Sequence, residues 1–173
     1  MTQGLKLEFH SEPKCVASCP SHAITAKSQA KFIEPLIPGW LERNIVREIL
    51  SPQDLFYSRL FTRTKKNGKI RPIIDLKSLN VLIKSPKFKM ETVKKIAKGI
   101  LRSLWGCTLD IWDAYFFIPI NWKFHKFLAF KLGGRTLFQF LPFGLSPAPW
   151  AFSRVVTPIK KYLHKMLILL YSY

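Results

Sequence analysis

Apolar residues recur at the spacing of one helix face in three segments of the chain. These segments are residues 32–50, 93–104 and 147–163, and each has proline or glycine near at least one end. The second segment carries lysine and arginine on its opposite face, which is typical of an amphipathic helix. Pro158 should kink the third helix, because proline lacks the amide hydrogen that the helix needs. The apolar positions are Trp40, Leu41, Ile45, Ile49 and Leu50 in the first segment, and Phe152, Val155, Val156, Ile159 and Leu163 on the buried side of the third.

Two other segments have the pattern of β-hairpins. Residues 58–75 and 126–141 each contain two apolar-rich runs, joined by an Asn-Gly pair in the first and a Gly-Gly pair in the second. Such pairs are strong short-range signals for a hairpin turn. Lysines flank the turn of the first hairpin, so its tip is basic. Shorter β-prone runs at residues 107–111 and 166–171 predict further strands.

The order of these elements predicts the fold class. Residues 1–30 have neither a helical nor a strand period, which predicts a flexible lead-in. Residues 31–173 interleave strands and helices without a regular βαβ repeat, which favours an α+β fold with an antiparallel sheet packed on helices. With 48% hydrophobic residues, the 173-residue chain can bury the core of one ordinary domain.

The formal net charge of +18 is unevenly distributed along the chain. Residues 1–58 hold six Lys and Arg against six acids, whereas residues 59–102 hold fourteen against two. Such a basic block requires a polyanionic partner or a large solvated surface. Nucleic acid is the first candidate, because neutralising its phosphates releases counterions. A basic ribosomal-type or merely soluble domain explains the charge equally well.

The cysteines and the apolar runs bear on the compartment. Cys15, Cys19 and Cys107 are too few and too scattered for a disulfide framework, which favours an intracellular protein of the cytoplasm or nucleus. No secretory signal is present at the N-terminus, and no run reaches the ~20 apolar residues of a membrane span. His10 and His22 lie near the first two cysteines, but the spacing matches no zinc finger, and an unordered tail is the favoured interpretation.

Only four acidic residues follow residue 58, and Asp110 and Asp113 stand out among them. Asp110 lies within the β-prone run 107–111, where a buried carboxylate without a partner would cost several kcal/mol. A divalent cation is one partner, since Mg²⁺ takes one or two protein carboxylates together with water and substrate phosphates. An ion pair with a nearby lysine is the other, and without wider context it is the favoured interpretation.

Four motifs, in order, resemble those of reverse transcriptases. LDIWDAYF at residues 109–116 resembles the first palm motif, and KKNGKIRPIIDLKSLN at residues 65–80 resembles the fingers hairpin. FKMET at residues 88–92 is similar to the segment that follows that hairpin, and LPFGLSPAP at residues 141–149 resembles the second palm motif. The match covers about residues 56–157, and four ordered motifs make it highly specific. In their detailed residue sequence, the motifs resemble retrotransposon enzymes of the gypsy-like and DIRS-type groups.

The resemblance implies a fold and a reaction. Residues 31–173 would form the fingers and partial palm of a right-hand polymerase. That polymerase would be RNA-directed and would add deoxynucleotides to a primer by two-metal phosphoryl transfer. Its partners would be an RNA or DNA template-primer duplex and deoxynucleoside triphosphates. Asp110 would be the catalytic carboxylate and a ligand of two Mg²⁺ ions, with Mn²⁺ as the alternative metal. The backbone carbonyl of Ile111 would assist.

The resemblance also implies residues that hold the triphosphate of the incoming nucleotide. Lys65 and Arg71 would grip it, because lysine offers a point charge and arginine a bidentate fork. Asp113 and Ala114 would supply backbone amides near the phosphates.

Two aromatic positions and a glycine complete the implied nucleotide site. Tyr115 would lie under the sugar, where its bulk excludes a 2′-hydroxyl and selects deoxynucleotides. Phe143 and Gly144 would lie near the nucleotide and the template. Ordinary core packing is the alternative for the two aromatic side chains.

The C-terminal part of the sequence lacks the other metal ligands that the family resemblance implies. In this family the other metal ligands are adjacent aspartates of a Tyr-x-Asp-Asp hairpin, whereas here no acid follows Asp113. The chain is therefore expected to stop before that motif, to lack the C-terminal half of the polymerase, and to bind nucleic acid without polymerising. The alternatives are a non-catalytic nucleic-acid-binding remnant of a retroelement and a basic structural protein with chance motifs. The ordered motifs disfavour the last.

Overall fold

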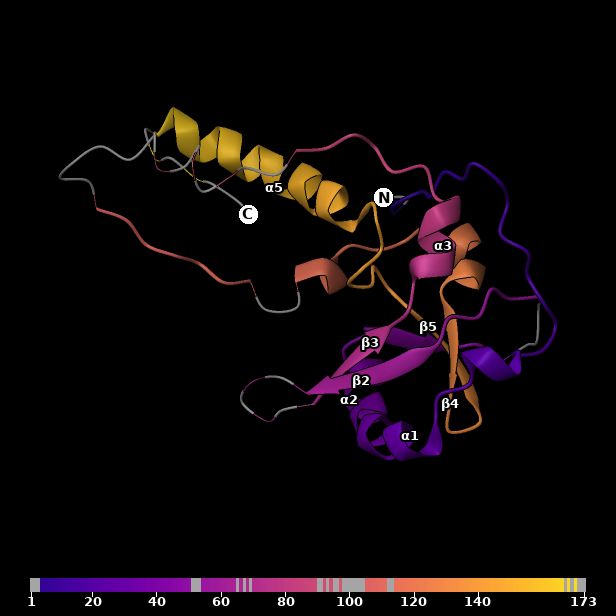
Figure 1. The fold of residues 1–173 in the computed structure, drawn as a ribbon. Helices are drawn as coiled ribbons and strands as arrows, with labels where there is room; N and C mark the ends of the chain where they lie inside the picture. The colour runs from indigo at the N-terminus through magenta and orange to yellow at the C-terminus, as the bar shows by residue number, and fades with distance from the viewer. Residues whose placement is uncertain are drawn as a thin grey trace.

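The computed structural model describes residues 4–50, 54–64, 66, 68, 70–89, 92, 94, 97, 105–111, 114–166, 168 and 170. These residues form one three-stranded sheet and one two-stranded sheet, both antiparallel, with helices around them (Figure 1). The α+β class expected from the sequence is confirmed. The strands are β1 (Val46–Glu48), β2 (Leu60–Thr64), β3 (Ile70–Ile74), β4 (Ala129–Leu132) and β5 (Arg135–Gln139).

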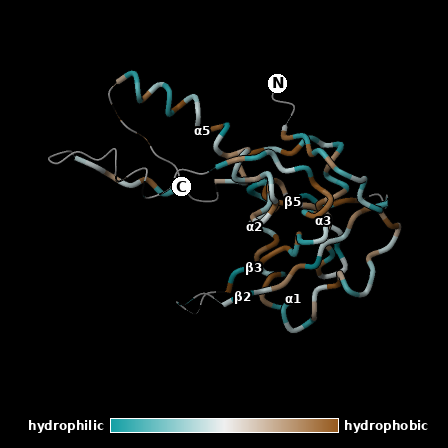
Figure 2. Tube along the Cα trace, turned by 45° about the horizontal axis from the view of Figure 1, so that its top comes forward, coloured by the Kyte–Doolittle hydropathy of each residue, from teal (hydrophilic) through white to brown (hydrophobic). Residues whose placement is uncertain are grey.

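Short helices lie beside the two sheets, and one long helix, α5, extends away from them (Figure 1). Hydrophobic and hydrophilic positions alternate along α5 (Figure 2). None of the helices in the described ranges combines the length and the apolarity needed to cross a lipid bilayer. The α-helices are α1 (Lys27–Ile33), α2 (Ile37–Glu42), α3 (Lys77–Leu82) and α5 (Ala148–Lys165), and the 3₁₀ helices are η1 (Ser21–Ala23), η2 (Glu34–Leu36), η3 (Ala114–Phe117) and η4 (Trp122–Phe127).

The three-stranded sheet, in the order β1-β5-β4, contains the centre of the core. Its hairpin β4–β5 pairs Phe130 with Leu137, and both side chains are fully buried. Gly133 and Gly134 form the turn with φ of +55° and +78°. Positive φ at both turn residues suits the right-handed twist of paired strands, and glycine adopts it without strain. The predicted second hairpin is confirmed.

The two-stranded sheet is the hairpin β2–β3, which was also predicted and is confirmed. Burial falls along its length: Leu60 and Ile74 are buried where the hairpin joins the core, whereas Thr64 and Ile70 are exposed near the turn. Pro72 is tolerated within β3 because no third strand among the described residues pairs with this hairpin, so one edge of β3 donates no ladder hydrogen bonds there.

The predicted helix over residues 32–50 is only partly correct. Helical structure ends at Glu42, and Asn44 turns the chain with a φ of +54°. The following residues form β1, which pairs with β5 and buries Val46. Pairing with a strand that lies about 90 residues away overrides the local helical spacing of Ile45 and Ile49, a common outcome for short segments.

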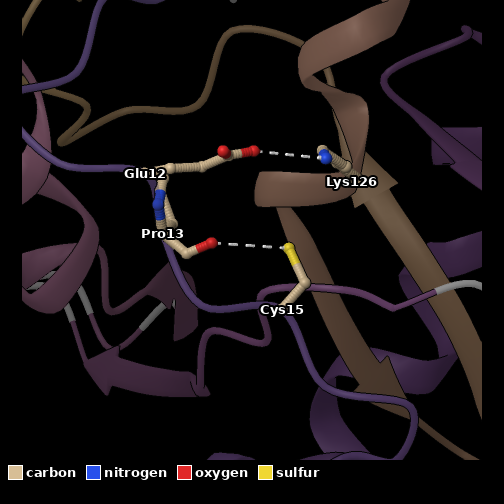
Figure 3. Close-up of polar contacts among 4 residues, drawn as sticks. All are labelled: Glu12, Pro13, Cys15 and Lys126. Atoms are coloured by element: carbon tan, nitrogen blue, oxygen red, sulfur yellow. Dashed lines mark hydrogen bonds and ion pairs between the residues drawn. The ribbon is translucent and has the colours of Figure 1, made fainter.

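The predicted lead-in, residues 1–30, packs along the domain in its described part. Leu5 forms a single β-bridge to Ile120, and Leu7 is buried in the core. Glu12 forms an ion pair of 3.6 Å with Lys126 of η4 (Figure 3). The described part of this segment thus contacts the domain, and α1 begins within it at Lys27. One short signal for this contact went unrecognised in the sequence: Leu5, Leu7 and Phe9 alternate with Lys6 and Glu8, which is the period of a strand.

The two cysteines of this segment have no described catalytic partner. The Cys15 thiol points to the carbonyl of Pro13 at 3.8 Å (Figure 3). Burial raises the pKa of both Cys15 and Cys19 above the ordinary thiol value. A raised pKa lowers the fraction of reactive thiolate at neutral pH.

The helix predicted from residue 147 is confirmed as α5, but its predicted buried side is partly wrong. Val155 and Ile159 are 55% and 54% exposed, whereas Ala148, Ala151 and Val156 are buried. The spacing identified the helix correctly. It could not show that only the first half of α5 lies against the core. Pro158 lies inside this helix, and the kink stays a prediction.

The strand predicted at residues 107–111 is wrong. Residues 105–111 have no regular secondary structure and are exposed, with Leu109 at 83%. A strand needs a hydrogen-bonded neighbour, and no segment in the described ranges pairs with this one. The helix predicted at residues 93–104 and the strand predicted at residues 166–171 fall largely outside the described residues.

Candidate active site

Three residues that the sequence assigned to a nucleotide site lie together in the structure. Arg71 of β3 places its guanidinium carbon 5.4 Å from the centre of the Phe143 ring. The Phe143 ring lies 4.7 Å from the ring of Tyr115, which belongs to η3. Arg71, Tyr115 and Phe143 come from three separate segments, so only the tertiary fold brings them together. A cation over an aromatic face is mutually attractive, and it orients the guanidinium.

The loop that carries Phe143 is fixed by apolar anchors on both sides. Leu141, Pro142 and Leu145 are fully buried, whereas Phe143 is 40% exposed. Gly144 has a φ of +92°, and a Cβ built there would meet no atom within 4 Å. Glycine is therefore needed at this position for backbone conformation rather than for space. The loop presents an aromatic face and an open backbone to solvent.

Tyr115 lies in an aromatic cluster with Phe143 and Phe152, whose ring centre is 5.6 Å away. Burial raises the pKa of the Tyr115 hydroxyl, so the phenol remains protonated at neutral pH. Phe116 also contacts Phe143, with ring centres 5.5 Å apart. The core-packing alternative thus describes part of this cluster, but the exposed Phe143 leaves one side of it open. Ala114 begins η3, directly before Tyr115.

The register of β2–β3 reveals a second arginine that sequence reasoning missed. Arg63 lies directly opposite Arg71 in the ladder, and both are exposed. Like charges directly opposite one another destabilise a strand pair. Neither arginine has an acidic partner within the part of the chain that the structure describes. A bound anion would relieve this repulsion, so this face of the hairpin is suited to phosphate.

Only the register could have identified Arg63. A two-residue Asn-Gly turn would place Thr64 opposite Arg71, whereas the observed ladder pairs Thr64 with Ile70. The shift of one residue brings the two arginines onto the same face.

Asp110 and Ile111 do not form a complete metal site with their described neighbours. Both are exposed, and Asp110 forms no ion pair with a described lysine, so the lysine alternative is not observed. The described ranges contain no group of three or more His, Cys, Asp or Glu side chains that could hold a metal ion. Asp110 is the carboxylate that the sequence assigned to this centre, and one carboxylate is insufficient for two metal ions. Lys65 and Asp113 lie outside the described residues.

Comparison with known proteins gives a consistent result. The profile of a family described as reverse transcriptase (RNA-dependent DNA polymerase) matches residues 63–173. The chain is 31% identical over 129 residues to the Gag-Pro-Pol polyprotein of human T-cell leukemia virus 3 (strain 2026ND). That alignment covers 65% of this chain and 9% of the polyprotein. The chain is 27% identical over 151 residues to the Pol polyprotein of equine infectious anemia virus (isolate 1369). That alignment covers 72% of this chain and 13% of the Pol polyprotein. The chain thus spans about a tenth of the length of these curated relatives.

Proposed function

The chain belongs to the reverse transcriptase family, and on this premise we propose that it forms the nucleotide-binding and template-binding face of an RNA-directed DNA polymerase. Members of this family act on a nucleic-acid template and deoxynucleoside triphosphates and use divalent metal ions. Residues 31–173 are proposed to form the fingers and partial palm. The residue sequence of the motifs supports an origin in a retrotransposon of the gypsy-like or DIRS-type group.

One observation carries the proposal: Arg71, Phe143 and Tyr115 meet at an exposed surface. Arg71 would bind the triphosphate through a bidentate fork, with Phe143 limiting the directions in which its guanidinium can point. Tyr115 would pack against the sugar, and the neighbouring rings of Phe143 and Phe152 hold its ring in place for that purpose. Gly144 would allow close approach of the nucleotide or template, since no side chain occupies its outer face.

The remaining phosphate contacts are assigned by the family resemblance. Ala114 would contribute a backbone amide at the start of η3, together with Asp113. Lys65 would supply a second cation near the hairpin turn. The ladder pair Arg63–Arg71 supports an anion at this end of the hairpin, because it leaves two positive charges facing each other.

The metal centre is proposed only as far as Asp110 and the backbone carbonyl of Ile111. Two Mg²⁺ ions, or Mn²⁺ in their place, would supply charge neutralisation at the transferred phosphate. Asp110 is exposed and free to act as one ligand. One carboxylate cannot hold two metal ions by itself, so no step of the reaction is assigned to this centre.

Binding to an RNA/DNA hybrid tests the nucleic-acid part of the proposal. Fluorescence anisotropy should show an affinity that falls steeply as salt rises, because several phosphate contacts release counterions. Changing both Arg63 and Arg71 to Gln should reduce the salt slope by about two. The matched control is Arg135→Gln, an exposed arginine of the other hairpin, which should leave the slope unchanged. Binding that is absent or insensitive to salt would contradict the proposal.

Metal binding by Asp110 has a separate test. Electron paramagnetic resonance of Mn²⁺ should show weaker binding to the Asp110→Asn variant than to the unaltered chain. Affinity for the hybrid should stay within about twofold, because an exposed acid makes no favourable contact with phosphate. Loss of hybrid binding and of metal binding together would show that Asp110 is structural.

A further inference from the structure

We infer that Asn80 is a positioning residue of the nucleotide site, an inference that rests on the proposed function. Its side chain joins α3 to the loop that carries Phe143, through two hydrogen bonds. Asn80 Nδ2 donates to the carbonyl of Gly144 at 2.7 Å. The backbone N–H of Ser146 donates to Asn80 Oδ1 at 2.8 Å.

The chemistry of the two bonds requires an amide. One loop group is an acceptor and the other is a donor, so the side chain must both donate and accept at its end. This requirement also fixes which end of the amide faces which group. A carboxylate can accept from Ser146 but cannot donate to Gly144, and an alanine does neither. Asparagine is also short enough to be held firmly by the backbone of α3.

The helix that carries Asn80 is itself firmly anchored. Leu79, the preceding residue, is fully buried, and the Asn80 N–H donates to the carbonyl of Leu76 at 2.8 Å. Asn80 follows Arg71 by nine residues, and α3 follows β3 after two intervening residues. The two bonds therefore connect the segment that carries Arg71 to the loop that carries Phe143.

This connection matters because the tip of the loop is otherwise held by ring contacts of Phe143 and by one backbone hydrogen bond, from the Leu145 N–H to the carbonyl of Pro142 at 3.3 Å. Gly144 is open on its Cβ side, and Phe143 is partly exposed. The buried anchors Leu141 and Leu145 hold the base of the loop, whereas Asn80 holds the carbonyl next to its tip. Asn80 thus fixes the position of the Phe143 ring relative to Arg71 and Tyr115. Loss of both bonds should let Phe143 move away from the arginine while the core stays intact.

A purely structural role would have a different consequence. It would lower the free energy of unfolding but leave the nucleotide affinity of the folded protein unchanged. The two roles are distinguished by measuring the free energy of unfolding and the nucleotide affinity on the same variants. Hydrogen exchange at the Ser146 amide then shows whether the loop itself has changed.

Two variants and one control make the test. Asn80→Ala removes both bonds, and Asn80→Asp keeps the acceptor for Ser146 while removing the donor to Gly144. Asn121→Ala is the matched control, because Asn121 Oδ1 accepts from the backbone N–H of Lys123 at 3.1 Å in η4, outside the site. Hydrogen exchange at the Ser146 amide reports on the loop. Titration of a fluorescent deoxyadenosine triphosphate, with RNA/DNA hybrid and Mg²⁺ present, reports on the site.

In Asn80→Ala, Ser146 exchange should accelerate and the nucleotide Kd should rise about tenfold, since the two hydrogen bonds that order the site are lost. In Asn80→Asp, Ser146 should stay protected while the Kd still rises, because the Gly144 carbonyl faces a carboxylate. In Asn121→Ala, both readouts should match the unaltered chain. An unchanged Kd in Asn80→Ala with faster Ser146 exchange would overturn the positioning role. Unchanged Ser146 exchange would overturn the connection itself.

The failure of the broader proposal would look different. If the unaltered chain binds no nucleotide, the proposed function is overturned and the positioning role falls with it. Exchange at Ser146 would then still show whether Asn80 holds the loop, because that readout needs no ligand.

Discussion

The two hairpins of the molecule are built from similar signals but have opposite surroundings. Hairpin β4–β5 turns at two glycines, adds β1 to its edge and buries Phe130 and Leu137 in the core. Hairpin β2–β3 has no third strand in the described ranges, and its outer half is exposed. Its outer half also places Arg63 opposite Arg71, which costs stability unless an anion lies between them.

This difference separates stability from binding. The β4–β5 hairpin satisfies its backbone and buries its side chains, so its sequence is constrained by packing. The outer half of β2–β3 buries little and concentrates positive charge, which is the pattern of a binding surface rather than of a core. The contact of Arg71 with Phe143 shows where that surface meets the rest of the domain.

The largest expected effect comes from shortening a side chain in the core hairpin. Leu137→Ala should lower the free energy of unfolding by about 3 kcal/mol, because it leaves a cavity between buried neighbours. The matched change Ile70→Ala, at the exposed end of β3, should cost about 1 kcal/mol or less. Urea denaturation measures both. Equal costs would show that the outer half of β2–β3 belongs to the core.

A smaller difference is expected between the two turns. Gly134 and Gly68 have φ of +78° and +76°, and neither would have a Cβ contact within 4 Å. Gly134→Ala should cost about 1 kcal/mol, since an L-residue is strained there. Gly68→Ala should cost less, because Gly68 is exposed at the end of its hairpin that lies away from the core. Thermal unfolding of the two variants gives the comparison, and a larger loss for Gly68→Ala would reverse it.

The charge pair predicts a small gain in stability. Arg63→Gln should raise the free energy of unfolding by about 0.3 kcal/mol, because it relieves the repulsion from Arg71. The same change should reduce the salt slope of hybrid binding by about one. A loss of stability in low salt would mean that Arg63 makes a favourable contact in the free protein.

The smallest effect expected is a pH dependence of stability that arises at His125, a residue of η4 that packs on the core sheet. The His125 ring stacks on Phe138 at 4.2 Å, and burial lowers its pKa below the ordinary histidine value, with Arg47 adding to the shift and a hydrogen bond to Ile120 opposing it. Protonation therefore favours the unfolded state, so stability is full above the ordinary pKa and declines as the pH falls through the lowered one. His125→Gln should remove this part of the decline in urea midpoints, whereas His164→Gln, at the exposed end of α5, should retain it.

Local signals predicted much of the fold. Glycine pairs between apolar runs identified both hairpins, and helical spacing identified α2 and α5. β1 was not predictable, because three residues become a strand only through pairing with β5. The partners of the N-terminal segment and the exposure of Val155 and Ile159 also depend on distant parts of the chain. The predicted strand at residues 107–111 failed for the same reason, since propensity cannot supply a pairing partner.

The candidate site shows the same division. Family resemblance named Arg71, Tyr115 and Phe143, and the structure brings them together. Arg63 depends on a register that shifts by one residue, and Asn80 depends on contacts that span more than 60 residues of sequence. Neither the strand register nor these long-range contacts can be read from a local sequence pattern.

The most direct test of the central claim is the affinity of a deoxynucleoside triphosphate for the unaltered chain and for Arg71→Gln, measured with RNA/DNA hybrid and Mg²⁺. Arg71→Gln should raise the Kd about tenfold or more, because a charge-assisted bond to phosphate is lost. The urea midpoint should change little, since Arg71 is exposed. Equal nucleotide affinity in the two proteins would contradict the assignment of this surface as the nucleotide site.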